Sequence, residues 1–288
     1  MDAKQFVKDA FSRNLGIVSE SQQQQLLSTR VAVAGAGGVG GLHLLTLARL
    51  GVGRFTLADP DIFEAVNINR QYGAMQSTLG RSKVDVLAEM LRDINPAVEL
   101  TVIREGIGPE NVAEFFEGVD VYVDDIDFFE IAARRLVFQT ARQRGIYAIT
   151  AAPLGFGATL QVFSPSGMSF DEYCGISDSM SSIEQVAAFA AGLAPHPYHT
   201  RYLDFAYVNF STGKGPAVSP ACTLAASFVA TEVVKIVTGM GRVKPVPHYL
   251  QVDLLLNKYT RGYLFLGGRN PFQILKRRLI LGKLRSGS

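Results

Sequence analysis

The sequence predicts an α/β fold built on a doubly wound, mostly parallel sheet, with antiparallel strands toward the C-terminal half. Short apolar runs of strand length alternate with helical stretches over the first 150 residues, and a glycine-rich turn follows the first run. From residue 158 onward, apolar and polar residues alternate as in antiparallel strands. The chain has 288 residues, 48% of them hydrophobic, which is enough to bury the core of one large domain.

The first half of the chain is predicted to form successive strand–helix units. Residues 31–35 (Val-Ala-Val-Ala-Gly) are typical of a buried parallel strand, and a helical stretch follows the glycine turn up to Leu50. Asn95 and Pro96 end a later helix. The remaining strands are expected at 54–58, 98–103, 120–123 and 147–150, and the helices between them at 80–94, 109–116 and 128–142.

The second half differs in composition. Residues 164–220 are rich in Gly, Pro, Ser, Asp and Tyr, which predicts a long crossover segment that acts as a variable lid or loop. Within it the sequence predicts one helix at 182–191, and around it strands at 158–163, 248–253 and 262–266 and a helix at 220–238. We therefore expect one domain over 1–268 and a basic tail or linker over 269–288.

Charge is distributed unevenly along the chain. The formal net charge is only +2, so the body gives no general signal for nucleic-acid binding. Residues 269–288 hold six basic side chains and no acidic one, which leaves 22 basic and 26 acidic side chains, a net charge of −4, in the rest. This basic tail has three open interpretations: a helix packed on the domain, a contact with a partner or a membrane surface, or a linker to a further module.

The composition favours a reducing cytoplasm. Two cysteines are too few for a disulfide framework, and the first residues lack the apolar stretch of a signal peptide. The longest apolar stretch, 221–237, is interrupted by Glu232 and Lys235, so a membrane-spanning helix is not expected. Cytoplasmic localisation is the expectation that follows.

A glycine-rich turn at residues 35–40 (Gly-Ala-Gly-Gly-Val-Gly) lies between the first predicted strand and helix. Glycine allows a tight turn and close approach of a phosphate, and the following helix is expected to offer free N–H groups at its N-terminus. Asp59 ends the next strand, where a carboxylate can bond the hydroxyls of a ribose. This Rossmann-like arrangement predicts an adenine nucleotide, and by itself it fits NAD, FAD, a methyl donor or ATP.

The residues from Asp59 onward favour ATP. The chain reads Asp-Pro-Asp at 59–61, Asn-Ile-Asn-Arg-Gln at 67–71 and Gly-Arg-Ser-Lys at 80–83. An enzyme that directs attack on the α-phosphate of ATP must stabilise the negative charge of the departing pyrophosphate, and fixed Arg and Lys side chains suit that task. Hydride transfer has no such need, because the backbone binds the dinucleotide phosphates.

Together these motifs resemble the ThiF/MoeB/HesA family of ubiquitin-activating-enzyme-like adenylyltransferases. That family carries G-x-G-G-x-G, D-x-D, N-x-x-R-Q and G-x-x-K in this order, and all four occur here. Phe-Ser-Arg at 11–13 is similar to the family's R-Y-S-R-Q opening, and Asp-Asp-Ile-Asp at 124–127 to its D-C-T-D-N. Its late E-x-x-K-x-x-x-G has a counterpart at 232–239. The resemblance covers residues 10–165 and 215–266, approximately.

The resemblance implies adenylation of a carboxylate by ATP with Mg²⁺, on the C-terminus of a ubiquitin-like protein or on a small molecule. It implies that Asp59 binds the ribose with Asp61 beside it, and that Asp127 binds Mg²⁺. Arg13 is expected to reach the ATP of the other subunit in a homodimer. The resemblance further implies that the nucleotide is cradled by Gly35, Gly37, Gly38 and Gly40 and that its phosphates are held by Asn67, Arg70 and Lys83. The expected catalytic residues are Arg70, Lys83, Arg13 and Asp127.

Several points of the predicted site stay open. Asp124 or Asp125 is an alternative metal ligand, and Asp127 is also suited to cap a helix. Phe128 replaces the Asn that follows the metal-binding aspartate of the family, which can alter the pocket around Mg²⁺. Val66 likewise replaces a small polar residue of the family pattern.

Cysteine and histidine chemistry is not expected to dominate. Cys174 and Cys222 cannot form the two C-x-x-C pairs of a zinc site, so no zinc is predicted. Cys174 lies in the crossover segment, where some family members use a catalytic cysteine, but its acidic neighbours would raise the pKa of its thiol. His196 and His199 have no second pair of metal ligands, so they are expected to be ordinary loop residues.

Three competing functions stay open at this point. The branch of tRNA threonylcarbamoyladenosine dehydratases resembles the motifs at 67–71 and 123–127. A nicotinamide-dependent oxidoreductase explains the glycine turn and Asp59 but gives no role to the cations Arg13, Arg70 and Lys83. A pseudoenzyme would keep the fold and bind a partner through residues 164–220. None of the motifs specifies which carboxylate is the substrate, or its pathway.

Overall fold

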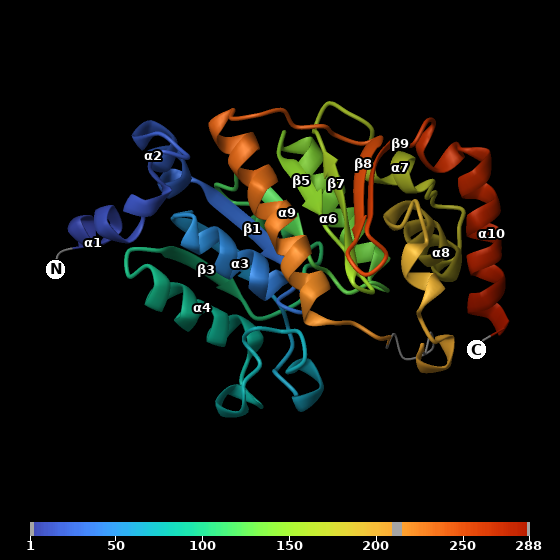
Figure 1. The fold of residues 1–288 in the computed structure, drawn as a ribbon, viewed down its shortest axis with the longest axis horizontal. Helices are drawn as coiled ribbons and strands as arrows, with labels where there is room; N and C mark the ends of the chain where they lie inside the picture. The colour runs from blue at the N-terminus through green and yellow to red at the C-terminus, as the bar shows by residue number, and fades with distance from the viewer. Residues whose placement is uncertain (1–2, 209–214, 287–288) are drawn as a thin grey trace. The chain divides into compact units, whose positions relative to one another are not determined.

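The structure, a computed structural model, describes residues 3–208 and 215–286 (Figure 1). Its internal contacts divide the chain into two compact units. The first unit consists of Met1–Asp125 and Ala226–Val243, and the second of Ile126–Ala225 and Lys244–Ser288. The chain therefore leaves the first unit directly after Asp125 and returns to it within a helix.

Four parallel strands form the sheet of the first unit. Their order is β3-β2-β1-β4, so β2 and β3 lie on one side of β1 and β4 lies on the other side of β1. Apolar residues fill these strands because both faces of the sheet are covered, and Val31, Ala32 and Val33 of β1 are fully buried. The strands are β1 (Arg30–Ala34), β2 (Arg54–Ala58), β3 (Glu99–Ile103) and β4 (Val121–Asp124).

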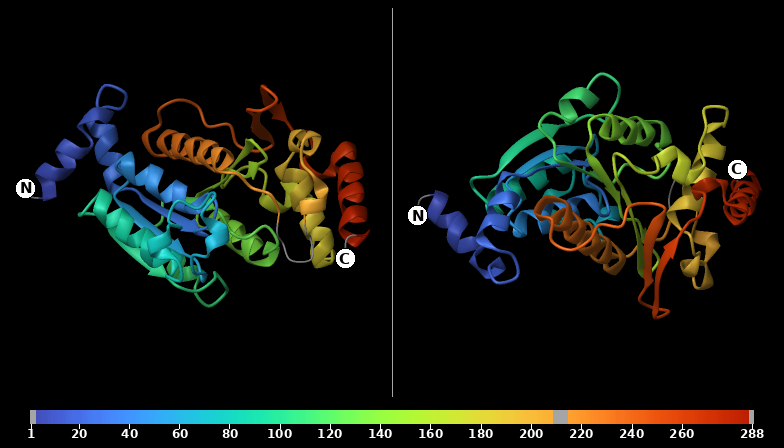
Figure 2. Two further views of the ribbon diagram at one scale, coloured as in Figure 1. Left: turned by 60° about the horizontal axis from the view of Figure 1, so that its bottom comes forward. Right: turned by 90° about the horizontal axis from the view of Figure 1, so that it is seen from above.

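The helices of the first unit follow its strands. Helix α3 packs on β1 and lies beside α4, which packs on β3 (Figures 1 and 2). The Ser19 side chain accepts a hydrogen bond from Gln22 N–H at the start of α2, and Ser82 caps α4 in the same way. The helices are α1 (Ala3–Ala10), α2 (Glu20–Ser28), α3 (Gly40–Arg49), α4 (Lys83–Ile94) and α5 (Val112–Phe115).

Antiparallel strands form the sheet of the second unit. Strand β7 pairs with β5 and with β8, β8 pairs with β9, and the short β6 forms a tight hairpin with β7. Strand β9 ends this order and is a sheet edge. The strands are β5 (Tyr147–Thr150), β6 (Pro153–Leu154), β7 (Gly157–Phe163), β8 (His248–Asp253) and β9 (Lys258–Tyr263).

Helices of the second unit gather around α8. Helix α8 contacts α6, α7 and α10, and the views agree that α8 and α10 lie side by side (Figures 1 and 2). The rings of Phe138 on α6 and Phe170 on α7 stack with their centroids 4.5 Å apart. The helices are α6 (Ile131–Gln143), α7 (Phe170–Cys174), α8 (Ser182–Leu193) and α10 (Pro271–Ser286).

Helix α9 (Ser219–Thr238) contains the point at which the two units divide. Contrary to the expectation from the sequence, it is long and apolar enough to cross a membrane by length and composition alone. Its residues Cys222, Ala225, Val229 and Val233 are fully buried at spacings of three and four, as in a helix that packs inside a protein. We therefore assign α9 to the protein core.

The predicted α/β class is confirmed, with parallel strands in the first unit and antiparallel strands in the second. The strand predicted at 262–266 is displaced: β9 covers Lys258–Tyr263, and most of its side chains are exposed, so no apolar run marks it. Within the 164–220 segment, the helix predicted at 182–191 is confirmed as α8, and the segment also contains the short capped helix α7, which the sequence did not predict. The action of this segment as a lid or loop stays a prediction. Residues 209–214 of that segment lie outside the described residues.

The predicted division into 1–268 and 269–288 stays a prediction. Residues 269–286, the described part of the predicted tail, form the end of a short turn and helix α10. They belong to the second compact unit, where α10 contacts α8. Of the three interpretations of the tail, the structure thus favours a helix that packs on the protein.

Candidate functional site

The carboxyl ends of β1 and β4 mark the candidate site of the first unit. In the order β3-β2-β1-β4 the strand connections change direction between β1 and β4, which is where open α/β sheets bind ligands. The glycine turn follows β1 directly, and Asp125 follows β4. Register pairing of Ala34 with Asp124 places these two strand ends side by side.

Asp125 holds the glycine turn through its side chain. Its Oδ2 accepts hydrogen bonds from the N–H groups of Gly37 at 3.0 Å and Gly40 at 2.7 Å. The N–H group of Ala36 donates to Asp59 Oδ2 at 2.6 Å. The expectation of free N–H groups at the start of α3 is therefore wrong for these positions, because two carboxylates already accept from them.

Two glycines of the turn are required by close packing. A Cβ atom on Gly35, whose φ is +94°, would lie 1.9 Å from the backbone oxygen of Asp125. A Cβ atom on Gly40 would lie 2.1 Å from the carbonyl oxygen of Gly35. Gly37 has more room, since its nearest neighbour would be Asp125 Oδ2 at 3.4 Å. The pattern thus encodes a tight junction between the β1 turn and the segment after β4.

The electrostatic environment of Asp125 is unusual for a carboxylate. The pKa of Asp125 is raised to about 7, mainly by burial and also by the nearby charges of Asp124 and Asp59, while the N–H groups of Gly40 and Gly37 act to lower it. The sequence had left Asp124 and Asp125 open as metal ligands. Asp124 is buried beside Tyr122, whose hydroxyl donates to its Oδ1 at 3.1 Å, so the two aspartates have different surroundings.

A chain of hydrogen bonds links the glycine turn to Lys83. Asp59, which accepts from Ala36, also accepts the N–H group of Asp61 at 2.8 Å. The Lys83 amine then forms an ion pair of 2.8 Å with Asp61 Oδ2. The Lys83 side chain is only 7% exposed, although it stands in the first turn of α4. Four of the predicted positions are therefore connected: the turn, Asp59, Asp61 and Lys83.

Asn67 and Arg70 lie on the loop between β2 and α4. Asn67 is buried, and its Oδ1 accepts from Glu64 N–H at 2.9 Å, which fixes a short 3₁₀ turn. The Arg70 guanidinium donates to Val66 O and to Asn69 Oδ1, at 3.2 and 3.0 Å. Both residues thus support this loop, and their contact with phosphates stays a prediction.

Gln71 is a candidate site residue to which the sequence assigned no role. Its side chain is 5% exposed, and its Oε1 has no hydrogen-bond partner among the residues that the structure describes. Its Nε2 points toward the glycine turn, since a Cβ atom on Gly37 would lie 3.8 Å from it. The sequence did contain a signal for this residue, because Gln71 is the last residue of the N-x-x-R-Q motif. A buried amide with an unused acceptor beside a nucleotide turn is suited to bind a ligand group.

Arg13 stands apart from these groups. It lies on a short 3₁₀ turn before α2 and is exposed. Within residues 3–208 and 215–286 its guanidinium makes no hydrogen bond or ion pair. An exposed cation with no internal partner is consistent with action on another molecule, and its predicted role across a dimer stays a prediction.

Asp127 belongs to the second unit. Its Oδ1 accepts from Phe129 N–H at 2.9 Å, and its carbonyl oxygen accepts from Arg134 Nη1 at 3.1 Å. Arg134 also donates to the carbonyl oxygen of Ile126. Helix α6 begins only at Ile131, so Asp127 closes a local turn and does not cap the helix.

Phe128, the departure from the family pattern beside Asp127, has a packing role. Its ring lies 5.1 Å from that of Phe129 and 5.3 Å from that of Phe189. The guanidinium of Arg134 stacks 4.3 Å from the Phe189 ring and so joins the same cluster. An aromatic residue at position 128 therefore fixes the segment that carries Asp127.

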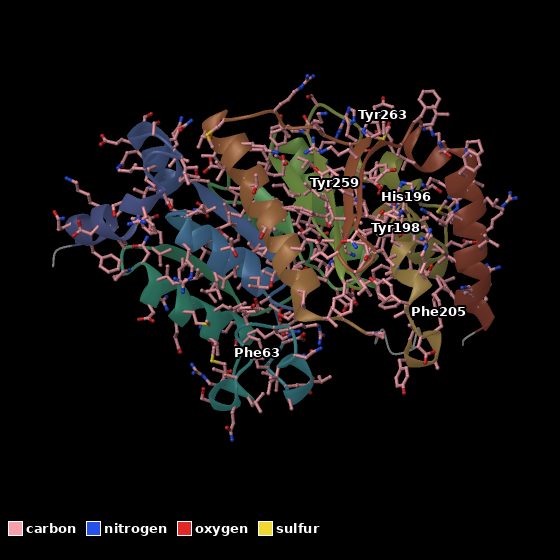
Figure 3. All side chains as sticks on the ribbon, viewed as in Figure 1. Phe63, His196, Tyr198, Phe205, Tyr259 and Tyr263 are labelled. Carbon is pink, nitrogen blue, oxygen red and sulfur yellow. The ribbon has the colours of Figure 1, made fainter. Side chains whose placement is uncertain are left out.

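The two cysteines and the loop histidines take structural positions. Cys174 and Cys222 are both buried and form no disulfide, so neither is accessible as a nucleophile. His196 Nε2 forms a hydrogen bond of 2.9 Å with the hydroxyl of Tyr249, and the His196 ring stacks on the ring of Tyr198 (Figure 3). No group of three or more His, Cys, Asp or Glu side chains suited to a metal ion occurs in the described part of the chain.

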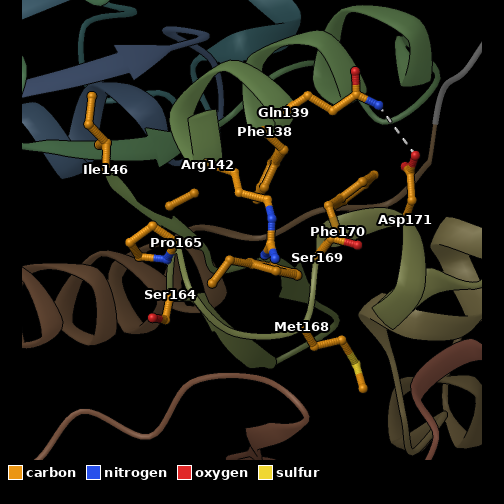
Figure 4. A pocket seen from close by; sticks show the side chains of 12 residues that line it. Phe138, Gln139, Arg142, Ile146, Ser164, Pro165, Met168, Ser169, Phe170 and Asp171 are labelled. Atoms are coloured by element: carbon orange, nitrogen blue, oxygen red, sulfur yellow. Dashed lines mark hydrogen bonds between the residues drawn. The ribbon is translucent and has the colours of Figure 1, made fainter. Parts of the chain in front are cut away.

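A cavity of about 120 Å³ lies in the second unit, apart from the predicted site residues (Figure 4). Phe138 and Phe163 supply apolar walls, and Arg142 crosses it to donate to the carbonyl oxygen of Gly167 at 2.6 Å. None of its lining residues belongs to the nucleotide motifs. The cavity therefore does not include the residues that are predicted to bind the nucleotide.

Known proteins resemble this chain in sequence. Residues 11–264 match the model of the ThiF family. A tRNA threonylcarbamoyladenosine dehydratase of Bacillus subtilis is 39% identical over 118 residues, which are 41% of this chain and 46% of the relative. The sulfur carrier protein ThiS adenylyltransferase of Escherichia coli is 30% identical over 165 residues, 57% of this chain and 65% of the relative. The chain thus spans less than two thirds of the length of these curated relatives.

The fold also has counterparts among solved structures. The crystal structure of PaaA matches with a TM-score of 0.67 at 19% identity, over 91% of this chain and 74% of PaaA. At that identity the match concerns the fold alone. The family model, by contrast, covers most of the chain and includes every predicted nucleotide-binding residue. This protein therefore belongs to the ThiF family.

Proposed function

We propose that this protein uses ATP to adenylate a carboxylate. The observation that carries the proposal is the buried amine of Lys83, which Asp61 and Asp59 connect to the glycine turn at the carboxyl end of β1. A buried cation beside a nucleotide turn is suited to phosphoryl and nucleotidyl transfer, where charge moves onto a leaving group. An oxidoreductase would leave this cation without a role. Relatives named adenylyltransferases support the same reaction class.

In the proposed reaction a carboxylate oxygen of the substrate attacks the α-phosphorus of ATP. The new bond gives an acyl adenylate, and the bond from the α-phosphorus to the bridging oxygen breaks, so pyrophosphate leaves with the electron pair. Lys83 and Arg70 stabilise the charge on that leaving group, and Asn67 orients the phosphates. The chain needs no nucleophile of its own, which agrees with the burial of Cys174 and Cys222.

Mg²⁺ is proposed as the cofactor that neutralises phosphate charge when it is bound. Mg²⁺ is commonly held by one or two carboxylates together with substrate phosphates, so no large cluster of acids is needed. Asp127 fits this role because its carboxylate is exposed and Phe129 N–H uses only its Oδ1. Asp125 fits it less well, since its Oδ2 already accepts two backbone N–H groups.

A homodimer is proposed as the active form. The loop between β2 and α4 exposes several large apolar side chains, a pattern that favours coverage by another protein surface. They are Ile62, Val66, Ile68, Tyr72, Met75 and Leu79. Arg70 lies on the same loop, and Arg13 is exposed and has no hydrogen-bond or ion-pair partner among the residues that the structure describes. We propose that a second copy covers this loop and brings its Arg13 to the nucleotide.

The substrate of the reaction has two candidate classes. A ubiquitin-like or sulfur-carrier protein is favoured by the relatives named for such proteins. A modified tRNA is favoured by the 39% identity to a tRNA threonylcarbamoyladenosine dehydratase. The threonyl group in the name of that relative carries a carboxylate. Removal of water from that group requires that its carboxylate be activated, as adenylation by ATP would do. The common step in both cases is attack of a carboxylate on ATP.

Exchange of labelled pyrophosphate into ATP tests the proposal directly. The assay would contain Mg²⁺ and one carboxylate at a time: sulfur-carrier proteins ending in Gly-Gly, small carboxylic acids, and tRNA carrying threonylcarbamoyladenosine. We expect exchange that depends on one of these and collapses in Lys83→Ala and Arg70→Ala. Arg81→Ala is the matched control, because Arg81 is an exposed cation of the same loop paired with Glu89. Binding of NAD(H) without binding of ATP would overturn the proposal.

A further inference from the structure

Helix α10 has an exposed apolar stripe on its outer face. Phe272, Leu275 and Leu279 are 81%, 56% and 63% exposed. At the helical rotation of 100° per residue these three side chains fall within an arc of about 60°. The chain leading into the helix adds exposed Phe265 and Leu266. Large apolar groups on one exposed face mark a surface that contacts something outside the fold.

The opposite face of α10 is already used by the protein. Gln273 and Leu284 are buried, the Lys276 amine donates to the carbonyl oxygen of Ala194 at 2.9 Å, and Arg277 donates to that of Gly175 at 3.0 Å. Arg285 forms an ion pair of 3.5 Å with Glu184 of α8. The helix is therefore anchored to the protein through its inner face, and its apolar stripe faces away from the core.

Positive charge surrounds the stripe. On the helix, Arg278 and Arg285 lie on one side of the stripe. Lys283 lies on the other side, where its amine stands 4.4 Å from the centroid of the Phe205 ring. The wider segment 239–288 holds ten basic residues and one acidic residue, which leaves 18 basic and 25 acidic residues for the rest of the chain. That acid, Asp253, is buried and accepts from Tyr202 and Leu256. The exposed surface of this segment is therefore strongly cationic.

This combination favours one class of partner over two others. A second copy is disfavoured, because a two-fold contact sets the same patch on itself, so the cationic flank that carries Arg278 would meet the cationic surface of the other copy. RNA is disfavoured because two of the three stripe side chains, Leu275 and Leu279, offer no stacking surface to bases. An anionic lipid surface accepts both features, since apolar side chains enter the acyl boundary while flanking cations meet the headgroups.

We propose that α10 binds the surface of anionic membranes through Phe272, Leu275 and Leu279. The helix lies in the plane of the interface and remains packed on α8 through its inner face. Arg278, an exposed cation beside the stripe, meets lipid phosphates. The protein is thus a peripheral membrane protein through this helix.

The chain contains no tryptophan, so one introduced at the stripe reports on that position alone. We expect Phe272→Trp to shift its emission to shorter wavelength with vesicles of phosphatidylcholine and phosphatidylglycerol, and not with phosphatidylcholine alone. Ile17→Trp is the matched control, because Ile17 is 78% exposed and belongs to the first unit. Its emission is expected to stay unchanged.

Flotation of the full chain with the same vesicles measures the strength of binding. Arg278→Gln is expected to weaken partition about fivefold, as for loss of one cation near an anionic surface. Leu275→Ser combined with Leu279→Ser is expected to abolish flotation at an unchanged melting temperature, since both side chains are exposed.

Three results would overturn the proposal. They are equal binding to neutral vesicles, a Trp shift with unfractionated tRNA but not with vesicles, and a Trp shift that depends on protein concentration alone. The last would assign the stripe to self-association.

Discussion

At the scale of single residues, the buried amine of Lys83 is the most informative feature of the site. We expect Lys83→Met to lower the rate of ATP–pyrophosphate exchange by about 10²- to 10³-fold, because a fixed charge that stabilises the leaving group is lost. Its partner Asp61 is 64% exposed and can be hydrated, so the melting temperature is expected to change little. Steady-state exchange and thermal unfolding of the same preparation check both parts.

Arg81→Met serves as the control for Lys83, since it removes an exposed cation two residues away. Equal losses of exchange in the two variants would indicate a general effect of charge on the loop. A loss of exchange in Lys83→Met that parallels a loss of folding would assign Lys83 to stability.

His43 makes a second prediction at the residue scale. Both of its ring nitrogens are buried without a hydrogen-bond partner among the described residues, and burial lowers the pKa of His43 to about 3. The unfolded chain gains a proton below its ordinary pKa of 6.5, and the folded chain does not, so this histidine makes the protein less stable as the pH falls from 6.5 toward 3.

Urea unfolding of the wild type and His43→Leu at pH 7.5 and 5.5 measures this contribution. The difference in unfolding free energy between the two proteins is expected to move by about 1.4 kcal/mol in favour of the variant at the lower pH. Other titrating groups contribute equally to both proteins and cancel. A difference that is the same at both pH values would show that His43 is not the source.

At the scale of elements, the glycine turn and the end of β4 form one packed unit. Gly40→Ala would place a Cβ atom 2.1 Å from the carbonyl oxygen of Gly35, and neither backbone segment can move without breaking the bonds to Asp125. We expect a loss of about 3 kcal/mol in stability together with loss of ATP binding. Thermal unfolding and calorimetry with ATP measure the two effects.

Gly106→Ala is the comparison for the glycine turn, because a Cβ atom there meets no atom within 4 Å. It should leave stability and ATP binding unchanged. If Gly40→Ala behaved in the same way, the tight junction described between the turn and Asp125 would be wrong.

The elements of the second unit explain why its sequence was harder to interpret. In the first unit, continuous apolar runs mark buried parallel strands, and β2 begins and ends where the sequence predicts it. Strand β9 is an exposed edge strand, so its sequence lacks the alternation of apolar and polar residues that marks a half-buried strand. Strand β6 has only two residues and depends on pairing with β7. Helix α7 is only five residues long and is specified mainly by the capping box of Ser169 and Glu172.

At the scale of the whole molecule, the proposed dimer makes a prediction that separates action within a subunit from action across subunits. Arg13→Ala and Lys83→Ala are each expected to be inactive as pure proteins. Coexpressed, half of the dimers would be mixed, and each mixed dimer would contain one intact site if Arg13 acts on its partner. Exchange activity of about a quarter of the wild type is then expected.

Activity in the coexpressed sample that stays at the level of the pure variants would assign Arg13 to its own subunit. Light scattering of the wild type provides the companion measurement. A strict monomer at the concentrations of the assay would remove the role proposed for Arg13 and for the apolar loop that carries Arg70.

The sequence by itself determined the fold class, the parallel half of the sheet, the glycine turn and the family. These depend on local apolar periodicity and on residue types at fixed spacing, which a single chain displays directly. Tertiary structure decided that Lys83 is buried, that Asp125 holds the turn, that Cys174 is inaccessible and that α10 keeps an apolar outer face. Each of these depends on which distant segments meet. Burial and hydrogen bonding arise from such contacts, and sequence spacing does not record them.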